Sequence, residues 1–179
     1  MIRYISILRG INVGGKRKII MKDLTQLYQN LGFTNVKTYI QSGNVVFNCK
    51  VDNHQEIEDL ISEAIQKEYG FEVPVLVRSK VEWLNIKNAN PFLEEDINQL
   101  HITMLKQIPE SEKVDFFKTF DSGPDRFYIE DRNIYICCGG AYRDTKLSNN
   151  LFEKKLGTNA TTRNWKTFMK LLSLSEEEN

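Results

Sequence analysis

The sequence has few residues of the kinds that catalyse reactions or hold metal ions. Only two histidines are present, and neither His54 nor His101 lies beside a serine or cysteine in a nucleophile motif. The three cysteines, Cys49, Cys137 and Cys138, are odd in number and contain no Cys-x-x-Cys pair. The cysteine spacing therefore indicates neither a disulfide framework nor a zinc site. We expect reduced structural thiols, bystander histidines and no metal site.

Long apolar runs are also missing. No window holds the roughly 18 consecutive apolar residues of a membrane span, and the first residues lack the pattern of a processed signal peptide. A hydrophobic content of 41% is nevertheless enough to fill a core, which argues against disorder. These features predict a cytoplasmic protein with one large domain or two small ones.

Charge is balanced in total but uneven along the chain. The 24 basic residues equal the 24 acidic ones. Residues 9–22 carry five basic side chains and no acidic one, and residues 143–170 carry seven basic and two acidic, which leaves 12 basic and 22 acidic elsewhere. If the two basic segments meet in space, they form a positive face on a neutral protein.

Apolar periodicity predicts alternating strands and helices in the first half of the chain. Strands are predicted over 2–8, 36–41, 44–49 and 73–77, and helices over 21–31 and between Asn53 and Gly70. Ser42-Gly43 is a two-residue connection of the kind that favours a tight hairpin. The order βαββαβ is that of the ferredoxin-like unit.

The second half repeats this pattern in part. After a connector over 79–98, whose short helix starts at a capping box of Ser79 and Glu82, the pattern predicts a strand at 100–106, a helix at 110–119 and a hairpin at 126–138. A helical region from 147 is interrupted at Gly157 and restarts at Thr161-Thr162, which gives βαββα without an eighth strand. The sequence thus predicts an α+β protein of two ferredoxin-like halves, 1–78 and 99–179, each a mostly antiparallel sheet covered by helices.

The basic loop 9–18 is the first of three segments that offer groups to an anion. Glycines let backbone N–H groups turn toward an anion, lysine and arginine supply charge, and the following helix adds its N-terminal dipole. The spacing matches neither GxxxxGK[ST] nor GxGxxG, so no cofactor motif is present. The alternative is that loop 9–18 is only a solvent-exposed connection, whose glycines satisfy the backbone geometry and whose charges face water. The candidate binding residues are Arg9, Gly10, Asn12, Gly14, Gly15, Lys16 and Lys18.

The second segment is the hairpin 39–47. Tyr39, Gln41, Ser42 and Asn44 carry hydroxyl and amide groups that can bond a ligand, although Ser42 and Asn44 suit the turn itself and we favour that structural role. The strands lack the aromatic pattern of an RNA-recognition sheet, which disfavours base stacking but not binding to a nucleic-acid backbone.

The third segment is 161–165. We predict that the threonines cap a helix and leave N–H donors beside Arg163 and Asn164, a second possible anion site. Trp165 starts an apolar stripe and is assigned to packing.

Three segments together resemble one bacterial family. They are 8–16 (Leu-Arg-Gly-Ile-Asn-Val-Gly-Gly-Lys), 39–47 (Tyr-Ile-Gln-Ser-Gly-Asn-Val-Val-Phe) and 161–165 (Thr-Thr-Arg-Asn-Trp), and 146–157 is similar as well. On these residues the chain resembles, over almost its whole length, the domain of unknown function family numbered sixteen-ninety-seven. The resemblance implies a cytoplasmic α+β protein with ferredoxin-like halves, and it implies no established reaction, cofactor or catalytic residue.

Three functions are compatible with these features. The leading hypothesis is a protein that binds a phosphate-bearing ligand or nucleic acid through loop 9–18, with Arg9, Lys16, Lys18 and Arg163 supplying charge. One alternative is an enzyme that acts on an anionic small molecule in a cleft between the halves, with Tyr39, Ser42 or Asn44 near the reacting centre. Another is a protein-interaction module.

Overall fold

The computed structural model describes residues 1–177 and divides them into two compact units. The first unit comprises residues 1–85 and 170–177, and the second comprises residues 86–169. The chain passes into the second unit within helix α3 (Lys80–Asn88) and returns within helix α6 (Trp165–Glu176). The expected division into 1–78, 79–98 and 99–179 differs from these units, because the connector is shared between them and residues 170–177 belong to the first.

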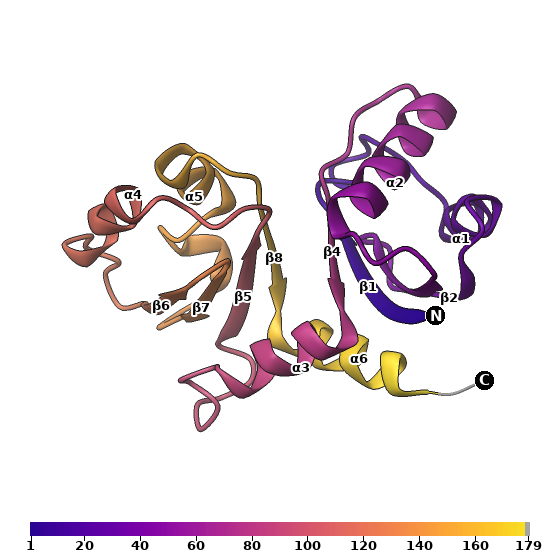
Figure 1. The fold of residues 1–179 in the computed structure, drawn as a ribbon. Coiled ribbons are helices and arrows are strands. Elements are labelled where there is room, and N and C mark those ends of the chain that lie inside the picture. The colour runs from indigo at the N-terminus through magenta and orange to yellow at the C-terminus, as the bar shows by residue number, and fades with distance from the viewer. Residues whose placement is uncertain (178–179) are drawn as a thin grey trace. The chain divides into compact units, whose positions relative to one another are not determined.

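The first unit is a four-stranded antiparallel sheet with two helices (Figure 1). Its strands are β1 (Ile2–Leu8), β2 (Thr34–Tyr39), β3 (Asn44–Cys49) and β4 (Val75–Ser79), in the order β2-β3-β1-β4. The helices are α1 (Met21–Asn30) and α2 (His54–Tyr69). The first half thus has the βαββαβ order that the sequence predicts.

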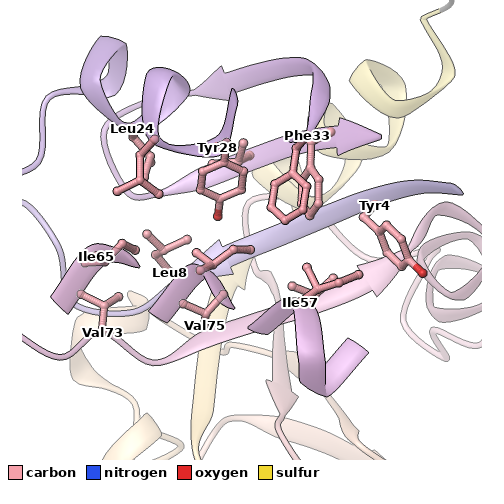
Figure 2. Packing of buried hydrophobic residues seen from close by; sticks show 14 of the residues in the cluster. Tyr4, Leu8, Leu24, Tyr28, Phe33, Ile57, Ile65, Val73 and Val75 are labelled. Atoms are coloured by element: carbon pink, nitrogen blue, oxygen red, sulfur yellow. The ribbon is translucent and has the colours of Figure 1, made fainter. Parts of the chain in front are cut away.

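Alternating residues of this sheet form a core with the two helices. Figure 2 shows Leu24 and Tyr28 of α1 and Ile57 of α2 in the same cluster as Tyr4 and Leu8 of β1. Each fully buried side chain of this size contributes about 1.5–3 kcal/mol of hydrophobic free energy. The core therefore fixes both ends of β1, including the end from which loop 9–18 departs.

The capping residues predicted for α2 and α3 are confirmed. The Oδ1 atom of Asn53 accepts from the N–H of Glu56 at 3.3 Å, and Gly70 ends α2 in the left-handed conformation at φ 76°. The N–H of Glu82 donates to Ser79 Oγ at 3.2 Å, and the N–H of Ser79 donates to Glu82 Oε2 at 2.8 Å.

The hairpin between β2 and β3 is longer than predicted. The strand expected over 36–41 ends at Tyr39, so the connection consists of the four residues 40–43 and not of Ser42-Gly43 alone. The reason lies in the backbone, because Ile40 already adopts a positive φ of 48° and Gly43 one of 77°. A left-handed residue departs from the extended backbone of a strand, and the pairing of β2 with β3 ends at Tyr39, opposite Asn44. Strand β4 also lies two residues later than the predicted 73–77.

The second unit has the same topology. Its strands β5 (Leu100–Leu105), β6 (Arg126–Glu130), β7 (Asn133–Cys137) and β8 (Ala160–Asn164) form an antiparallel sheet in the order β6-β7-β5-β8. The helix predicted over 110–119 is α4 (Ser111–Asp115) followed by a 3-10 turn at Phe116–Lys118. Helix α5 spans Asn149–Leu156, and a further 3-10 turn spans Tyr142–Asp144.

The predicted restart of a helix at Thr161-Thr162 is wrong. These threonines belong to β8, which pairs with β5 and completes βαββαβ in place of the expected βαββα. The β-branched Thr162 packs on the pleated sheet, where its Oγ1 lies 2.6 Å from Oγ1 of Thr103. Helix α6 starts at Trp165, and its cap is Asn164, whose Oδ1 accepts from the N–H of Thr167 at 2.8 Å.

Candidate functional site

Loop 9–18 folds into a miniature hairpin at one end of the first sheet. Val13 and Lys16 form an isolated antiparallel bridge, and the N–H of Lys16 donates to the carbonyl of Val13 at 3.0 Å. The turn residues Gly14 and Gly15 both have positive φ, 57° and 74°, as a type I′ turn requires. The two glycines therefore satisfy the geometry of the turn.

The side chain of Asn12 holds this hairpin to the rest of the unit. Its Nδ2 donates to the carbonyl of Ile19 at 2.9 Å and to the carbonyl of Gln41 at 2.8 Å, while its Oδ1 accepts from the N–H of Ile19 at 2.9 Å. Asn12 adopts φ 56°, which asparagine tolerates better than most residues. Two of the three predicted segments, 9–18 and 39–47, thus lie against each other.

The hairpin loop 40–43 is held in turn by Asn44, which is fully buried. The Nδ2 of Asn44 donates to the carbonyl of Tyr39 at 3.0 Å and to Ser42 Oγ at 2.8 Å. The carbonyl of Gly43 accepts from the N–H of Leu8 at 2.8 Å. The amide of Asn44 and the hydroxyl of Ser42 are therefore used to build the turn, the structural role favoured above.

A surface pocket of about 440 Å³ lies between the hairpin and the start of α1. It is lined by Asn12, Gly15, Lys18, Ile19, Ile20, Met21, Lys22 and Gln41. The N-cap position of α1 is Ile20, whose side chain cannot accept from the first turn of the helix. The N–H donors of that turn are consequently free of a side-chain cap, and they lie beside two lysines.

The basic side chains around this pocket are exposed. Lys16, Arg17, Lys18 and Lys22 are all exposed, and within residues 1–177 none of the four forms an ion pair. The one acidic residue in the first turn of α1 is Asp23, and it lines a different pocket, on the α2 side of the helix. Burial raises the pKa of Tyr69 in that pocket, and the charge of Asp23 raises it further. The pocket is thus bordered by positive charge.

The remaining predicted residues of the first unit lie around this region without lining the pocket. Arg9 is half-buried just after β1, and its N–H donates to the carbonyl of Pro74 at 3.0 Å. Gly10 adopts φ 72°, and Tyr39 is the half-buried last residue of β2. These three residues shape the end of the sheet on which the pocket rests.

Arg163 and Asn164 belong to the second unit. The Nη1 of Arg163 donates to the carbonyl of Thr162 at 3.0 Å, and burial lowers the pKa of Arg163 to about 10. Asn164 caps α6 by accepting from the N–H of Thr167, so the cap is this asparagine and not one of the predicted threonines. Arg163 lies on strand β8, and the anion site beside it stays a prediction.

The histidines and cysteines form no evident reaction centre. His101 Nδ1 lies 3.8 Å from Cys138 Sγ, but burial raises the pKa of the Cys138 thiol to about 11, which disfavours the nucleophilic thiolate. Among the described residues, no three histidine, cysteine or acidic side chains are grouped closely enough to hold a metal ion. Within the same residues, no helix combines the length and apolar character needed to cross a membrane.

Comparison with known proteins decides the family. A model of the family described as a protein of unknown function (DUF1697) matches residues 1–135, which include both loop 9–18 and hairpin 39–47. The chain belongs to the DUF1697 family. Among curated proteins, none matches this chain. The match ends before 146–157 and 161–165, so the resemblance of those segments rests on their residues alone.

A solved structure shows the same fold. The chain is 23% identical to the conserved bacterial protein SP0830 from Streptococcus pneumoniae, with a TM-score of 0.74, over 98% of this chain and 99% of that one. This DUF1697 chain thus shares an α+β architecture of two four-stranded sheets with that bacterial protein.

Sequence reasoning located the basic loop but missed part of the pocket. Lys22 was included in the basic segment 9–22 but was not assigned to the binding site, although it is the second residue of α1 and lines the pocket. The signal that points to it is Ile20, an apolar residue at a position where serine, threonine, aspartate or asparagine is usual. An uncapped helix start beside lysines is detectable in sequence only once the helix boundary is known.

Proposed function

We propose that this protein binds a phosphate-bearing ligand in the pocket between the 9–18 hairpin and the start of α1. The observation that carries the proposal is the uncapped first turn of α1, which opens on that pocket beside Lys18 and Lys22. Backbone N–H groups at a helix N-terminus and nearby ammonium groups are what phosphate oxygens bind.

The polar groups available in the pocket favour a ligand that is bound by its phosphate. Gln41 and Asn12 line the pocket, but the amide of Asn12 is occupied by Ile19 and Gln41, so few polar groups remain to read a base or a sugar. The exposed Lys16 and Arg17 extend the positive surface beyond the pocket. A nucleic-acid backbone or a nucleotide phosphate both fit this arrangement, and they share the same chemistry.

Binding can be measured by calorimetry with inorganic phosphate, mononucleotides and short oligonucleotides at low and moderate salt. The test variant is Lys18→Gln with Lys22→Gln. We expect the affinity to fall roughly fivefold or more, because two exposed charge contacts are removed. If oligonucleotides bind, the slope of log affinity against log salt concentration should also become less steep, by about the amount that two phosphate contacts contribute.

The control is Lys50→Gln. Lys50 is an exposed lysine of the same unit that follows β3, at the end of the sheet remote from the loop, since Cys49 pairs with Ile2. Equal loss of binding in the control and the double variant would contradict a localised site. Absence of heat with every phosphate compound would contradict the proposal itself.

The proposal includes a cytoplasmic location in a bacterium. Its support is the state of Cys49, Cys137 and Cys138, which are free and buried, as thiols of proteins from reducing compartments commonly are. Fractionation of cells that produce the protein, followed by detection with an antibody, tests this location.

A further inference from the structure

Strand β6 is an open edge of the second sheet (Figure 1). In the described part of the chain, no strand lies beyond it. The hairpin to β7 pairs Glu130 with Asn133 around a two-residue turn, so Glu130, Tyr128 and Arg126 exchange hydrogen bonds with β7. The backbone groups of Phe127 and Ile129 consequently point away from the sheet.

Two hydrogen bonds at the ends of β7 agree with this alternation. The N–H of Cys138 donates to the carbonyl of Gln99 at 2.9 Å, and the carbonyl of Arg132 accepts from the N–H of Leu105 at 2.8 Å. Residues 132 and 138 therefore face β5, whereas 133, 135 and 137 face β6. The outward donors and acceptors of β6 are those of residues 127 and 129.

This edge has fewer of the usual protections against pairing than the edge strand β2. Strand β2, an edge of the first sheet, has an irregular register between Thr34 and Lys37, and Lys37 carries a charge that forms an ion pair with Glu177 at 2.9 Å. Strand β6 has the sequence Arg-Phe-Tyr-Ile-Glu, with no proline, no lysine and an unbroken register to β7. Bulges, prolines, lysines and other charges are among the devices that prevent edge-to-edge contact, and β6 has of these only the opposite charges of Arg126 and Glu130 at its two ends.

We infer that β6 pairs antiparallel with β6 of a second copy of this chain. When the pairing is centred on Tyr128, Phe127 lies opposite Ile129 of the second copy, and their four outward backbone groups per side can form hydrogen bonds. The same register places Arg126 opposite Glu130 at both ends. Opposite charges in directly facing positions stabilise a pair of strands.

Other registers with the same hydrogen-bond alternation are less favourable. Centring the pair on Phe127 leaves Glu130 without a basic partner, and centring it on Ile129 places Arg126 opposite Arg132 of the second copy. Only the Tyr128 register uses the whole strand and both charges. Arg126 already contacts Glu95 at 2.7 Å, and its five N–H donors allow a second carboxylate to share it.

The side chains fit such an edge. Phe127 and Ile129 pack on the core of the second unit, while Tyr128 is 45% exposed on the other face and stacks on Tyr135. In the inferred pair the two Tyr128 rings meet across the two-fold axis. A single pair of five-residue strands buries less area than a standard protein interface, so we expect a weak, concentration-dependent dimer.

Sedimentation velocity of the full chain over a concentration series measures the dimer. Glu130→Arg places like charges opposite each other at both ends, and we expect the dissociation constant of the dimer to rise roughly tenfold. Mixing this variant with Arg126→Glu restores opposite charges and should restore the dimer. Glu112→Arg, the same charge change on the exposed face of α4, should leave the dimer unchanged.

A cysteine test fixes the register. Because position 128 alone lies opposite itself, Tyr128→Cys should form an intermolecular disulfide on oxidation. Glu130→Cys should not do so alone but should link to Arg126→Cys in a mixture. The three native cysteines are buried. A wild type that stays monomeric at every concentration, or a Tyr128→Cys chain that links no faster than Glu130→Cys, would overturn the inference.

Discussion

Single residues at the loop end of the first sheet have roles that their chemistry alone would not assign. Asn12 and Asn44 are polar and belong to the family-like segments, yet their amides are engaged with backbone groups of the loops they support. Gly43 is required by packing as well as by its positive φ, because a Cβ atom there would lie 2.6 Å from the Cβ of Leu8.

Gly43→Ala is therefore expected to destabilise the first unit by about 2–4 kcal/mol, from left-handed strain plus overpacking. Urea unfolding monitored at the first unit measures the loss. Gly32→Ala is the matched control, because Gly32 has a similar φ of 84° with open space around its Cβ position. An equal effect of the two substitutions would show that the contact with Leu8 has no influence.

Glu82 gives a pH-dependent prediction. Burial raises the pKa of this carboxyl, but hydrogen bonds from Ser79 and the charge of His54 outweigh it, so the pKa of Glu82 lies below its ordinary value. The folded carboxyl thus binds its proton less readily than the unfolded one, and its stabilisation is present above the unfolded pKa and lost as pH falls through the folded pKa.

The stability difference between wild type and Glu82→Gln should accordingly shrink on acidification. Thermal unfolding at several pH values between neutral and strongly acidic measures it. Glu63→Gln, on the exposed face of α2, is the control and should show no comparable trend. A difference that stays constant with pH would contradict the role of the Glu82 charge.

At the scale of elements, the start of α1 is the feature on which binding depends. Met21→Pro removes one N–H of the first turn while leaving a residue that helices accept at this position. Ile20 has φ −75° and ψ 135°, a conformation that suits a residue before proline. We expect a several-fold weaker affinity for inorganic phosphate with an unchanged circular dichroism spectrum. Equal affinity would remove the helix start from the site.

Elements with strong periodicity and standard caps are predictable from the sequence, whereas β8 has no such local signal and was not predicted. Helix α2 is defined by Asn53, Gly70 and an apolar stripe, all of which are local signals. The segment Ala160–Asn164 has no apolar alternation, and the Thr162 hydroxyl bonds the hydroxyl of Thr103 and donates to Asn149 Oδ1. Its strand conformation comes from pairing with β5, which is remote in sequence.

The site shows the same division. The glycines and charges of loop 9–18 are visible in the sequence, but the bond from Asn12 to Gln41 joins residues 29 positions apart. Sequence patterns identified the two segments, and only the fold shows that Asn12 fastens one to the other. The pocket depends on that contact, so its lining could not be derived from either segment alone.

At the scale of the whole molecule, the first unit is built from both ends of the described chain. Arg3 Nη2 donates to the carbonyl of Leu174 at 3.2 Å, and its Nη1 donates to the carbonyl of Asn35 at 2.9 Å. Lys37 and Glu177 form an ion pair at 2.9 Å. The end of α6 is therefore part of the first unit, although it follows the entire second unit in sequence.

Deleting the chain from Leu174 onward, which keeps the buried Leu171 and Leu172, should destabilise the first unit by on the order of 2 kcal/mol, through the lost contacts of Arg3 and Lys37. Amide hydrogen exchange, read separately for β1 and β5, measures it. We expect faster exchange in β1 and little change in β5. The opposite pattern would assign the end of α6 to the second unit.

The return of the chain to the first unit also orders events during synthesis. A ribosome releases β1 to β4 first and must then translate the whole second unit before residues 170–177 can dock beside Arg3. The nascent first unit therefore lacks its C-terminal segment at a time when the second unit, which is continuous in sequence, can already complete its folding. The earlier-made half of the protein is thus the later one to be completed.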